Sequence, residues 1–249
     1  MHGARVIPCL LVRGNGLVKT RRFREPTYLG DPVNAVRIFS DKEADEVVVL
    51  DIDASPSSRD PNFRLIEEMA GEAFMPVGYG GGVRTLDHVR RLIRAGVEKV
   101  IINTASVEVP DVIRASVAEY GSQAIVGAID VKRSMFGRYR AMIRSGSVDA
   151  KLAPIEQARR LVQLGVGELL VNNIDRDGTM EGFDVSLLRS IADEVSVPVV
   201  ACGGAGTVDH LKQAIRDGGA AAVAAGSMFV FHGRHRAVLI NYPTGLSLS

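Results

Sequence analysis

The sequence has little cysteine, no tryptophan and no surplus of charge. Its 249 residues include only two cysteines, Cys9 and Cys202, too few for the disulfide framework of a small secreted protein. We therefore expect a reducing, cytoplasmic environment. The formal net charge is +1, and so we expect neither nucleic acid nor an anionic membrane surface as a partner.

Long apolar runs and metal-binding patterns are also missing. The longest apolar stretches, such as 47–50 and 220–225, have the length of a strand and fall far short of a membrane span. Residue Arg5 already opens a strand-like segment, so we expect no leader peptide. The sequence contains no Cys-x-x-Cys or His-x-x-x-His pattern. We expect no metal ion and no other cofactor.

What the sequence does contain is an internal repeat with an offset of 122 residues. Segment 81–88 (GGVRTLDH) aligns with 203–210 (GGAGTVDH), and 93–94 aligns with 215–216. This offset is close to half of the chain, which indicates that one half has been duplicated. We expect a single domain, 1–249, made of two halves at about 1–122 and 123–249.

Short apolar segments alternate with amphipathic segments of helical period. We expect eight strands, at 5–12, 47–52, 76–79, 99–103, 124–130, 169–173, 198–201 and 220–225, with helices between them at 31–42, 62–73, 85–95, 110–119, 154–164, 184–194 and 207–216. The strands are nearly unbroken apolar runs, as in a parallel sheet covered by helices. Together with the repeat, this predicts an α/β fold, a (β/α)8 TIM barrel built from two duplicated half-barrels. An open doubly wound sheet is the alternative, but it does not explain a repeat of half the length.

Two connections are longer than the others, and both follow the carboxyl end of a predicted strand. Residues 12–30 contain a basic cluster at 19–24, and residues 132–153 contain a segment, 139–143, that we expect to form a small hairpin. Active sites of such barrels assemble from loops at this end. We therefore expect both connections to contribute to a site.

Glycine-rich loops follow two of the predicted strands, at 80–82 and 203–206. Glycine lets backbone N–H groups approach an anion, and the helix that follows adds partial positive charge. Tight turns are the simpler explanation, but the duplication favours anion binding, by a small molecule with a phosphate at each end. The residues that we assign to the two phosphate sites are Gly81, Gly82, Asn103, Thr104, Asp177, Gly178, Gly203, Gly204, Gly226 and Ser227.

Acidic residues stand where several predicted strands end, namely Asp51, Asp53, Asp130, Asp175 and Asp177. A carboxylate at the mouth of a barrel can transfer protons when its pKa and geometry suit. Asp130, which ends the apolar run 124–129, is the strongest catalytic candidate. A helix cap or an ion pair explains Asp51 as well as catalysis does.

Four charged residues stand at or before strand starts, on the opposite face of the predicted barrel. They are Arg5, Glu46, Lys99 and Glu168. Singly, each is an ordinary solvated strand end. Together, they predict a ring of ion pairs that closes the floor of the barrel. Exposed pairs add little stability, so the value of such a ring would lie in gating.

The sequence resembles the cyclase subunit of imidazole glycerol phosphate synthase, the HisF family, along nearly its full length. The motifs that carry the resemblance are 5–10 (RVIPCL), 18–19 (VK), 30–33 (GDPV), 80–84 (GGGVR), 102–105 (INTA), 121–123 (GSQ), 175–179 (DRDGT) and 203–206 (GGAG). The resemblance implies a HisH-like glutaminase docked on the floor as a heterodimer, and ammonia that passes through the barrel to a bisphosphorylated ribonucleotide. It also implies that Arg5, Glu46, Lys99 and Glu168 are the ammonia gate.

One position departs from the catalytic pattern of the family. The family uses aspartates at the ends of strands 1 and 5 as acid and base. Asp130 matches the second, whereas Leu11 stands at the first. Leucine cannot move a proton, and losing one positioned acid or base lowers the rate ~10²–10⁴-fold. Further departures on this face are Asp53, Gly78, Tyr79, Asn172, Asn173 and Cys202.

A retained gate with a lost acid resembles a divergent branch of the family, paired with a glutaminase in surface-sugar pathways. This implies an ammonia conduit to a separate sugar N-acetyl amidotransferase, for acetamidino-sugar (lipopolysaccharide, O-antigen) biosynthesis. The alternative is a working cyclase of histidine biosynthesis, with Asp53 in place of the missing carboxylate. It would convert the bisphosphorylated ribonucleotide plus ammonia into imidazole glycerol phosphate and an aminoimidazole carboxamide ribonucleotide. A structural binding barrel without ammonia transfer fits the floor charges least.

Overall fold

Eight parallel strands close into a barrel in the computed structural model, which describes residues 4–233 and 237–243. In order around the barrel they are β1 (Arg5–Arg13), β4 (Val47–Asp51), β5 (Val77–Gly80), β6 (Lys99–Ile102), β7 (Ile125–Arg133), β10 (Glu168–Asn173), β11 (Val199–Cys202) and β12 (Ala222–Ala225). The barrel closes where β12 pairs in parallel with β1. The predicted TIM barrel is confirmed.

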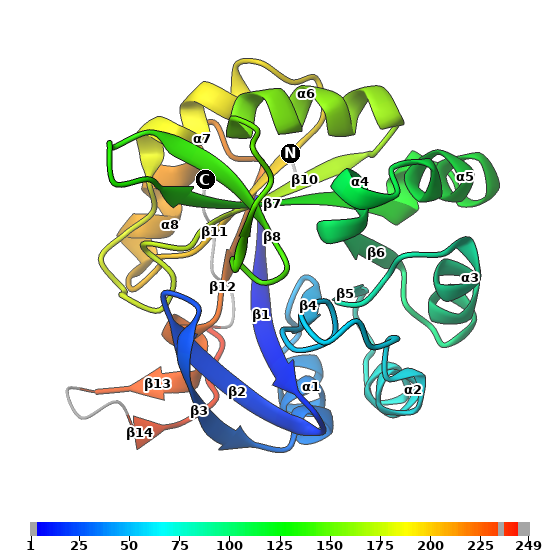
Figure 1. Ribbon diagram of the computed structural model, residues 1–249. Helices are drawn as coiled ribbons and strands as arrows, with labels where there is room; N and C mark the ends of the chain where they lie inside the picture. Colours follow the sequence, from blue (N-terminus) through cyan, green and yellow to red (C-terminus); the bar gives the residue numbers. More distant parts are fainter. Residues whose placement is uncertain (1–3, 234–236, 244–249) are drawn as a thin grey trace.

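Helices surround the barrel on its outside (Figure 1). The long ones are α1 (Pro32–Asp41), α2 (Phe63–Gly71), α3 (Leu86–Arg94), α5 (Asp111–Tyr120), α6 (Pro154–Leu164), α7 (Val185–Ala192) and α8 (Val208–Arg216). They match the predicted helices to within two residues at each end. Shorter segments are α4 (Thr104–Glu108), η1 (Ser122–Ala124) and α9 (Ser227–Val230).

The two copies of the sequence repeat begin their helices in the same way. The hydroxyl of Thr85 accepts a hydrogen bond from the backbone N–H of His88 at 3.2 Å, and Thr207 accepts one from His210 at 3.3 Å. Each threonine is therefore the N-cap of its helix. In both copies, Nδ1 of the histidine lies 3.2 Å from a backbone atom of its own glycine loop. The threonine caps match between the two copies, whereas the histidine contacts differ. Nδ1 of His88 faces the carbonyl oxygen of Gly82, and Nδ1 of His210 accepts a hydrogen bond from the N–H of Gly206. The division into two half-barrels stays a prediction.

Side chains along the strands alternate between two apolar clusters, because successive strand residues point to opposite faces. On β4, Val47 and Val49 belong to the cluster between barrel and helices, whereas Val48 lies inside the barrel. The inner cluster consists of Ile7, Cys9, Leu11, Val18, Val48, Ile101, Val126, Ala128, Leu170, Val200, Cys202, Ala222 and Ala224. The alternation therefore fixes which residues face the bore.

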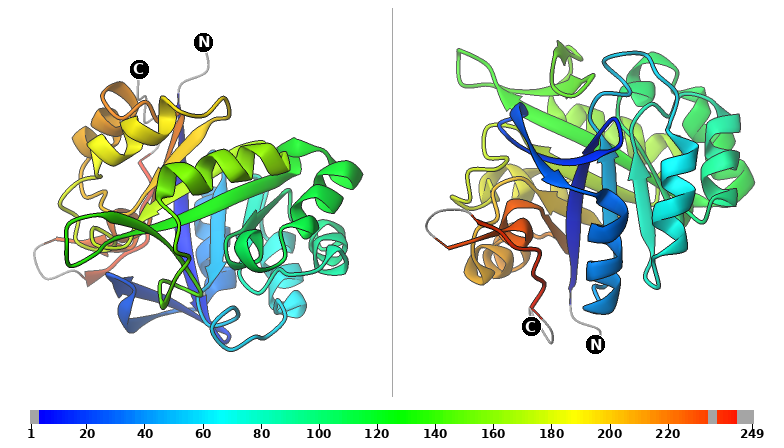
Figure 2. Two further views of the ribbon diagram at one scale, coloured as in Figure 1. Left: turned by 45° about the horizontal axis from the view of Figure 1, so that its top comes forward. Right: turned by 90° about the horizontal axis from the view of Figure 1, so that it is seen from below.

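Two hairpins project from the carboxyl end of the barrel (Figure 2, right). Strands β7, β8 (Tyr139–Ile143) and β9 (Val148–Asp149) form one, which contains the predicted segment 139–143. The other consists of β2 (Gly16–Arg21) and β3 (Arg24–Gly30). We treated 12–30 as a connecting loop, and that interpretation was wrong. Strand β1 instead reverses at Gly14, which has φ +60°, and pairs with β2.

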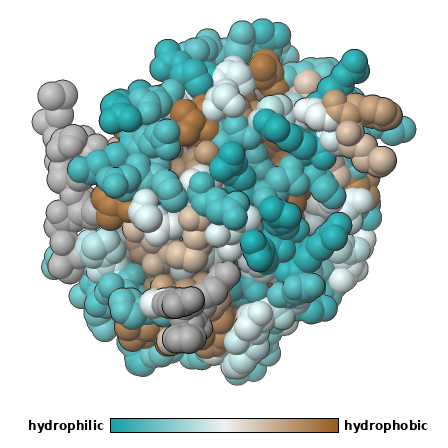
Figure 3. Space-filling view, turned by 90° about the vertical axis from the view of Figure 1, so that its left-hand side faces the viewer, coloured by the Kyte–Doolittle hydropathy of each residue, from teal (hydrophilic) through white to brown (hydrophobic). Residues whose placement is uncertain are grey.

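The surface seen from the side of α7 and α8 is mainly hydrophilic, with small and separated hydrophobic areas (Figure 3). Apolar side chains scattered in this way are ordinary on a folded domain. A further short hairpin joins β13 (Phe231–His232) to β14 (Ala237–Val238). Within residues 4–233 and 237–243, no helix is long and apolar enough to cross a membrane.

Candidate functional site

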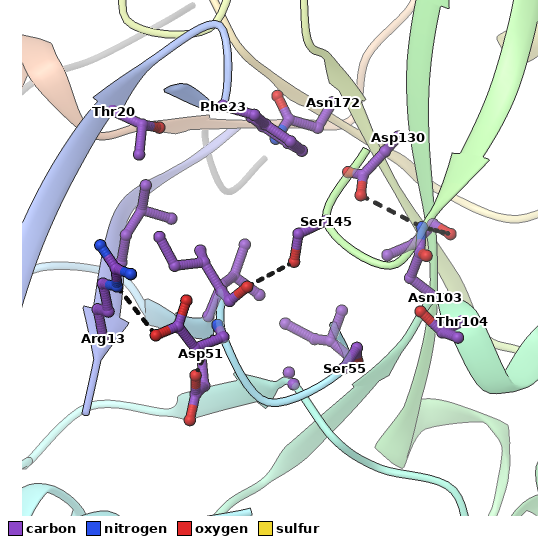
Figure 4. Close-up of a pocket in the computed structure, with 18 of the residues that line it drawn as sticks. Arg13, Thr20, Phe23, Asp51, Ser55, Asn103, Thr104, Asp130, Ser145 and Asn172 are labelled. Atoms are coloured by element: carbon purple, nitrogen blue, oxygen red, sulfur yellow. Dashed lines mark hydrogen bonds and ion pairs between the residues drawn. The ribbon is translucent and has the colours of Figure 1, made fainter. Parts of the chain in front are cut away.

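A cavity of about 290 Å³ opens at the carboxyl end of the barrel, between the two hairpins. Its floor consists of apolar side chains of the strands, namely Leu11, Leu50, Ile101, Ala128 and Leu170. Phe23 from the β2–β3 turn and Ser145 from the β8–β9 turn lie at its rim (Figure 4). The volume is close to the lower end of the range for small-molecule sites.

Asp130 projects into this cavity from β7 (Figure 4). The amide of Asn103 is 3.4 Å from its carboxylate. Burial, assisted by the negative charge of Asp177, raises the pKa of Asp130 to about 7. A carboxyl group with such a pKa can both give and accept a proton near neutral pH. The structure thus places the strongest catalytic candidate in the main cavity.

Leu11 lines the same cavity from β1. Its side chain is 5% exposed and belongs to the inner apolar cluster, next to Val18 of β2. An aspartate here would stand across the barrel from Asp130. The leucine turns that part of the wall apolar.

The other predicted acids are engaged in different contacts. One oxygen of Asp51 accepts hydrogen bonds from the backbone N–H groups of Asp53 and Ala54, both at 3.0 Å, so Asp51 caps the turn after β4. Asp53 lines the cavity, where it pairs with Arg13 at 2.9 Å. Asp175 accepts a hydrogen bond from the backbone N–H of Arg133 at 2.8 Å. Asp51 and Asp175 therefore stabilise the backbone around them, Asp51 in the turn after β4 and Asp175 at Arg133.

The ten predicted phosphate-site residues separate into two groups. Gly81, Gly82, Asn103 and Thr104 line the 290 Å³ cavity. Gly81 has φ +124° and Gly82 has φ +70°, and a Cβ on either would lie 2.6 Å from a backbone oxygen. These turns thus need glycine for steric reasons alone. Phosphate binding by this group stays a prediction.

The second group lines a much smaller cavity of about 10 Å³. Its members are Asp177, Gly178, Gly203, Gly204, Gly226 and Ser227. Lys19, only 5% exposed, extends from β2 so that its ammonium group lies against Gly226. The space holds about one water molecule, so a phosphate could enter only if Lys19 moved. Lys19 was expected only as part of the basic cluster at 19–24, and its place in this site was missed.

At the opposite end of the barrel, the four predicted floor residues form a closed ring. The two terminal nitrogens of Arg5 contact Glu46 and Glu168 separately. The ammonium group of Lys99 lies 2.8 Å from Glu46 and 2.9 Å from Glu168. The carboxylates are largely buried, with side-chain exposures of 4% and 11%. The predicted ring is therefore present, while its role as a gate stays a prediction.

Between the ring and the cavity, the inner wall is apolar. Gly78 and Gly80 of β5 leave no open gap in it, because a Cβ at Gly78 would lie 3.1 Å from Val48 and one at Gly80 would lie 2.9 Å from Leu50. A small molecule that travels along the axis must pass between packed apolar side chains. Such a wall favours a neutral molecule over an ion.

Three of the six further departures from the family pattern, Asp53, Asn172 and Cys202, line one or both cavities, whereas Gly78, Tyr79 and Asn173 line neither. Asn172 lies beside Asp130 in the β7–β10 register and lines both cavities. Its side-chain oxygen is buried and has no hydrogen-bond partner among the described residues. The thiol of Cys9 contacts that of Cys202, and this hydrogen bond together with burial raises the pKa of Cys202. Within the described ranges, no group of three or more His, Cys, Asp or Glu side chains could hold a metal ion.

Comparisons with known proteins agree with this geometry. A family model described as "Histidine biosynthesis protein" matches residues 5–235. The chain is 52% identical over 239 residues to "Putative imidazole glycerol phosphate synthase subunit hisF2" of Pseudomonas aeruginosa, covering 96% of this chain and 95% of the relative. The chain is also 47% identical over 242 residues to "Putative imidazole glycerol phosphate synthase subunit HisF" of Leptospira borgpetersenii, covering 97% of this chain and 95% of the relative. A third, hisF3 of Vibrio vulnificus, is 43% identical over 245 residues, covering 98% and 94%.

Proposed function

The chain belongs to the HisF family of histidine biosynthesis proteins, and from this membership we propose that it is the synthase subunit of a glutamine amidotransferase. It accepts ammonia from a HisH-like glutaminase at the ring of Arg5, Glu46, Lys99 and Glu168. The ammonia passes through the barrel to a sugar N-acetyl amidotransferase, which turns an acetamido group into an acetamidino group for lipopolysaccharide biosynthesis. The proposal places the complex in the cytoplasm, where both buried cysteines stay reduced.

The observation that carries the proposal is the contrast between the two ends of the barrel. The floor keeps all four charges in a closed ring. At the other end, Asp130 faces a wall in which Leu11 is buried among apolar side chains. Cyclisation needs a proton removed and a proton supplied at separate positions, and leucine can do neither. Delivery of ammonia needs only the floor and the bore.

The apolar wall between ring and cavity suits this delivery. Ammonia is neutral and enters apolar surroundings at far lower free energy than ammonium, which would have to leave its hydration shell. The ring closes the bore against water and ions until a partner opens it. A glutaminase docked on this face would release ammonia at the ring.

A cyclase of histidine biosynthesis remains the second candidate, and one observation favours it. Asp53 lines the same cavity as Asp130, whose pKa lies at about 7. The carboxylate of Asp53, however, is paired with Arg13 at 2.9 Å. To act as the second acid or base, Asp53 would have to leave this pair.

Direct supply of ammonium salt separates the two functions. The purified chain is mixed with the bisphosphorylated ribonucleotide and ammonium salt, without glutaminase, beside an authentic cyclase as positive control. We expect negligible turnover. Robust turnover would falsify the conduit and establish the cyclase.

Docking of the glutaminase is tested separately. We expect the cognate glutaminase to form a complex with this chain and to hydrolyse glutamine faster in it. If gel filtration at micromolar concentrations gives two separate peaks and mixing leaves glutaminase activity unchanged, the floor is not a docking face.

A further inference from the structure

A third cavity, of about 380 Å³, lies beside the main one of about 290 Å³, where the β2–β3 turn meets β7 and the loop after β10. Neither the glycine loops nor Asp130 line it. Its lining is Arg21, Arg22, Arg24, Glu25, Lys132, Ile174 and Asp175. Four cationic and two acidic side chains give it an excess of two positive charges.

Most of these cations have no anionic partner. Within the residues that the structure describes, no ion pair involves Arg21, Arg24 or Lys132. The guanidinium of Arg22 donates a hydrogen bond to the backbone oxygen of Asp175 at 3.0 Å. The carboxylate of Asp175 accepts its hydrogen bond from the backbone N–H of Arg133 instead. The cavity therefore offers unpaired donors.

The turn that carries the arginines is held in place. Arg22, Phe23 and Glu25 have φ values of 55°, 59° and 50°, a backbone conformation that the surroundings must enforce. The backbone N–H of Arg22 donates to the oxygen of Asp177 at 2.9 Å. At Gly178, a Cβ would lie 3.0 Å from the Cα of Arg21, so the two loops are in close contact. An anion thus meets arginines on a fixed backbone, which reduces the entropy lost on binding.

Charge is also concentrated on the two hairpins as a whole. Residues 13–30 contain five cationic and one acidic side chain, and residues 132–149 contain the same numbers. The hairpins therefore hold an excess of eight positive charges, whereas the whole chain has a net charge of +1. Such segregation creates a positive potential that steers anions to this end of the barrel.

We infer that the 380 Å³ cavity binds the pyrophosphate group of a nucleoside-diphosphate-linked compound. Guanidinium groups match phosphate oxygens in pairs, and a pyrophosphate diester has two negative charges, which equals the excess in the lining. The cavity is concave and within the usual size range of small-molecule sites. These properties favour a small anion over a protein or a nucleic acid strand.

The position of this cavity connects it to the main one. Arg24 and Glu25 line both cavities, so a ligand that is anchored by its pyrophosphate reaches toward Asp130. This last step rests on the proposed function. The anchored compound is the activated sugar, held beside the end of the bore for the sugar N-acetyl amidotransferase that converts its acetamido group.

Calorimetric titration tests the site with UDP, inorganic pyrophosphate and UDP-N-acetylglucosamine as probes. We expect saturable binding of all three, weakened by added salt. The variants Arg21→Gln, Arg24→Gln and Lys132→Gln should each weaken binding about tenfold. Arg64→Gln on α2, where the side chain is 90% exposed, is the matched control and should leave binding unchanged.

Three results would overturn the inference. The first is that none of the probes binds saturably up to about 1 mM. The second is that Arg64→Gln weakens binding as much as the cavity variants do. The third is that a single-stranded oligonucleotide binds more tightly than UDP. The titration contains neither glutaminase nor ammonia. Failure here therefore leaves the conduit intact, and turnover in the ammonium assay leaves this site intact.

Discussion

Leu11 and Asp130 lie on β1 and β7, which are diametrically opposite in the eight-stranded barrel, and both line the same cavity. One wall is therefore apolar at the level where the other presents a carboxyl group with a pKa of about 7. Under the proposed function, this asymmetry leaves ammonia delivery intact and removes one of the two proton-transfer groups. It also indicates which substitution tests the missing carboxylate most directly, namely Leu11→Asp.

Leu11→Asp places a second carboxyl group opposite Asp130. We expect turnover of the bisphosphorylated ribonucleotide with ammonium salt to rise at least about tenfold. Because the new carboxylate enters an apolar cluster, the free energy of unfolding should fall by about 2–4 kcal/mol. Turnover is measured well below the melting temperature. Leu11→Asn is the control of equal size and should give no rise, and a variant that folds without gaining activity would show that Leu11 is not the cause.

Asp130→Asn should change how stability depends on pH. In the unfolded chain the pKa of this carboxyl is about 3.9, so between pH 4 and 7 the folded protein binds more protons than the unfolded chain. Raising the pH through this window therefore lowers the free energy of unfolding. The variant lacks this loss, so above pH 7 its free energy of unfolding should exceed that of the wild type by roughly 4 kcal/mol. Urea unfolding at pH 5 and pH 8 measures it, and an equal pH dependence in both proteins would contradict it.

Lys99→Met should destabilise the floor of the barrel. The substitution leaves Glu46 and Glu168, both largely buried, with Arg5 as their common cation. We expect the free energy of unfolding to fall by about 1–3 kcal/mol. Arg216→Met breaks only an exposed contact with Asp217 and should lower it by less than about 0.5 kcal/mol. Equal losses in urea unfolding would mean that the ring contributes no more than a surface pair.

The duplicated caps should contribute equally to stability. Thr85→Ala and Thr207→Ala each remove one hydrogen bond to the start of a helix, and each should lower the free energy of unfolding by about 1 kcal/mol. Because the two caps belong to different half-barrels, the double variant should lose the sum. A double variant that loses markedly more would show that the half-barrels depend on each other at these turns.

The barrel and its floor could be predicted because their signals are local. Each barrel strand is an apolar run of the right length, and each long helix begins at a capping residue or a proline. Once the strands are parallel, their first residues meet at one end, which brings Arg5, Glu46, Lys99 and Glu168 together. The strand assignment alone was therefore enough to predict the ring.

The upper end of the barrel could not be predicted in the same detail. Strand β3 is exposed over most of its length and contains Pro26, so its pattern is that of a loop. Its pairing depends on β1 extending beyond the barrel and turning at Gly14. The position of Lys19 then follows from the register of Leu11 with Val18. Similarly, Asp51 and Asp53 differ by two positions and both line the cavity. Only the turn geometry decides that Asp51 caps the turn and that Asp53 pairs with Arg13.

The shared contacts at the floor have an electrostatic consequence. If Lys99 swings away, Arg5 still holds both carboxylates, because it presents a different nitrogen to each. The resulting aperture carries one uncompensated negative charge. Under the proposed function, ammonium would be retained at that rim, whereas neutral ammonia would experience no such attraction. The opened floor would then separate the two protonation states.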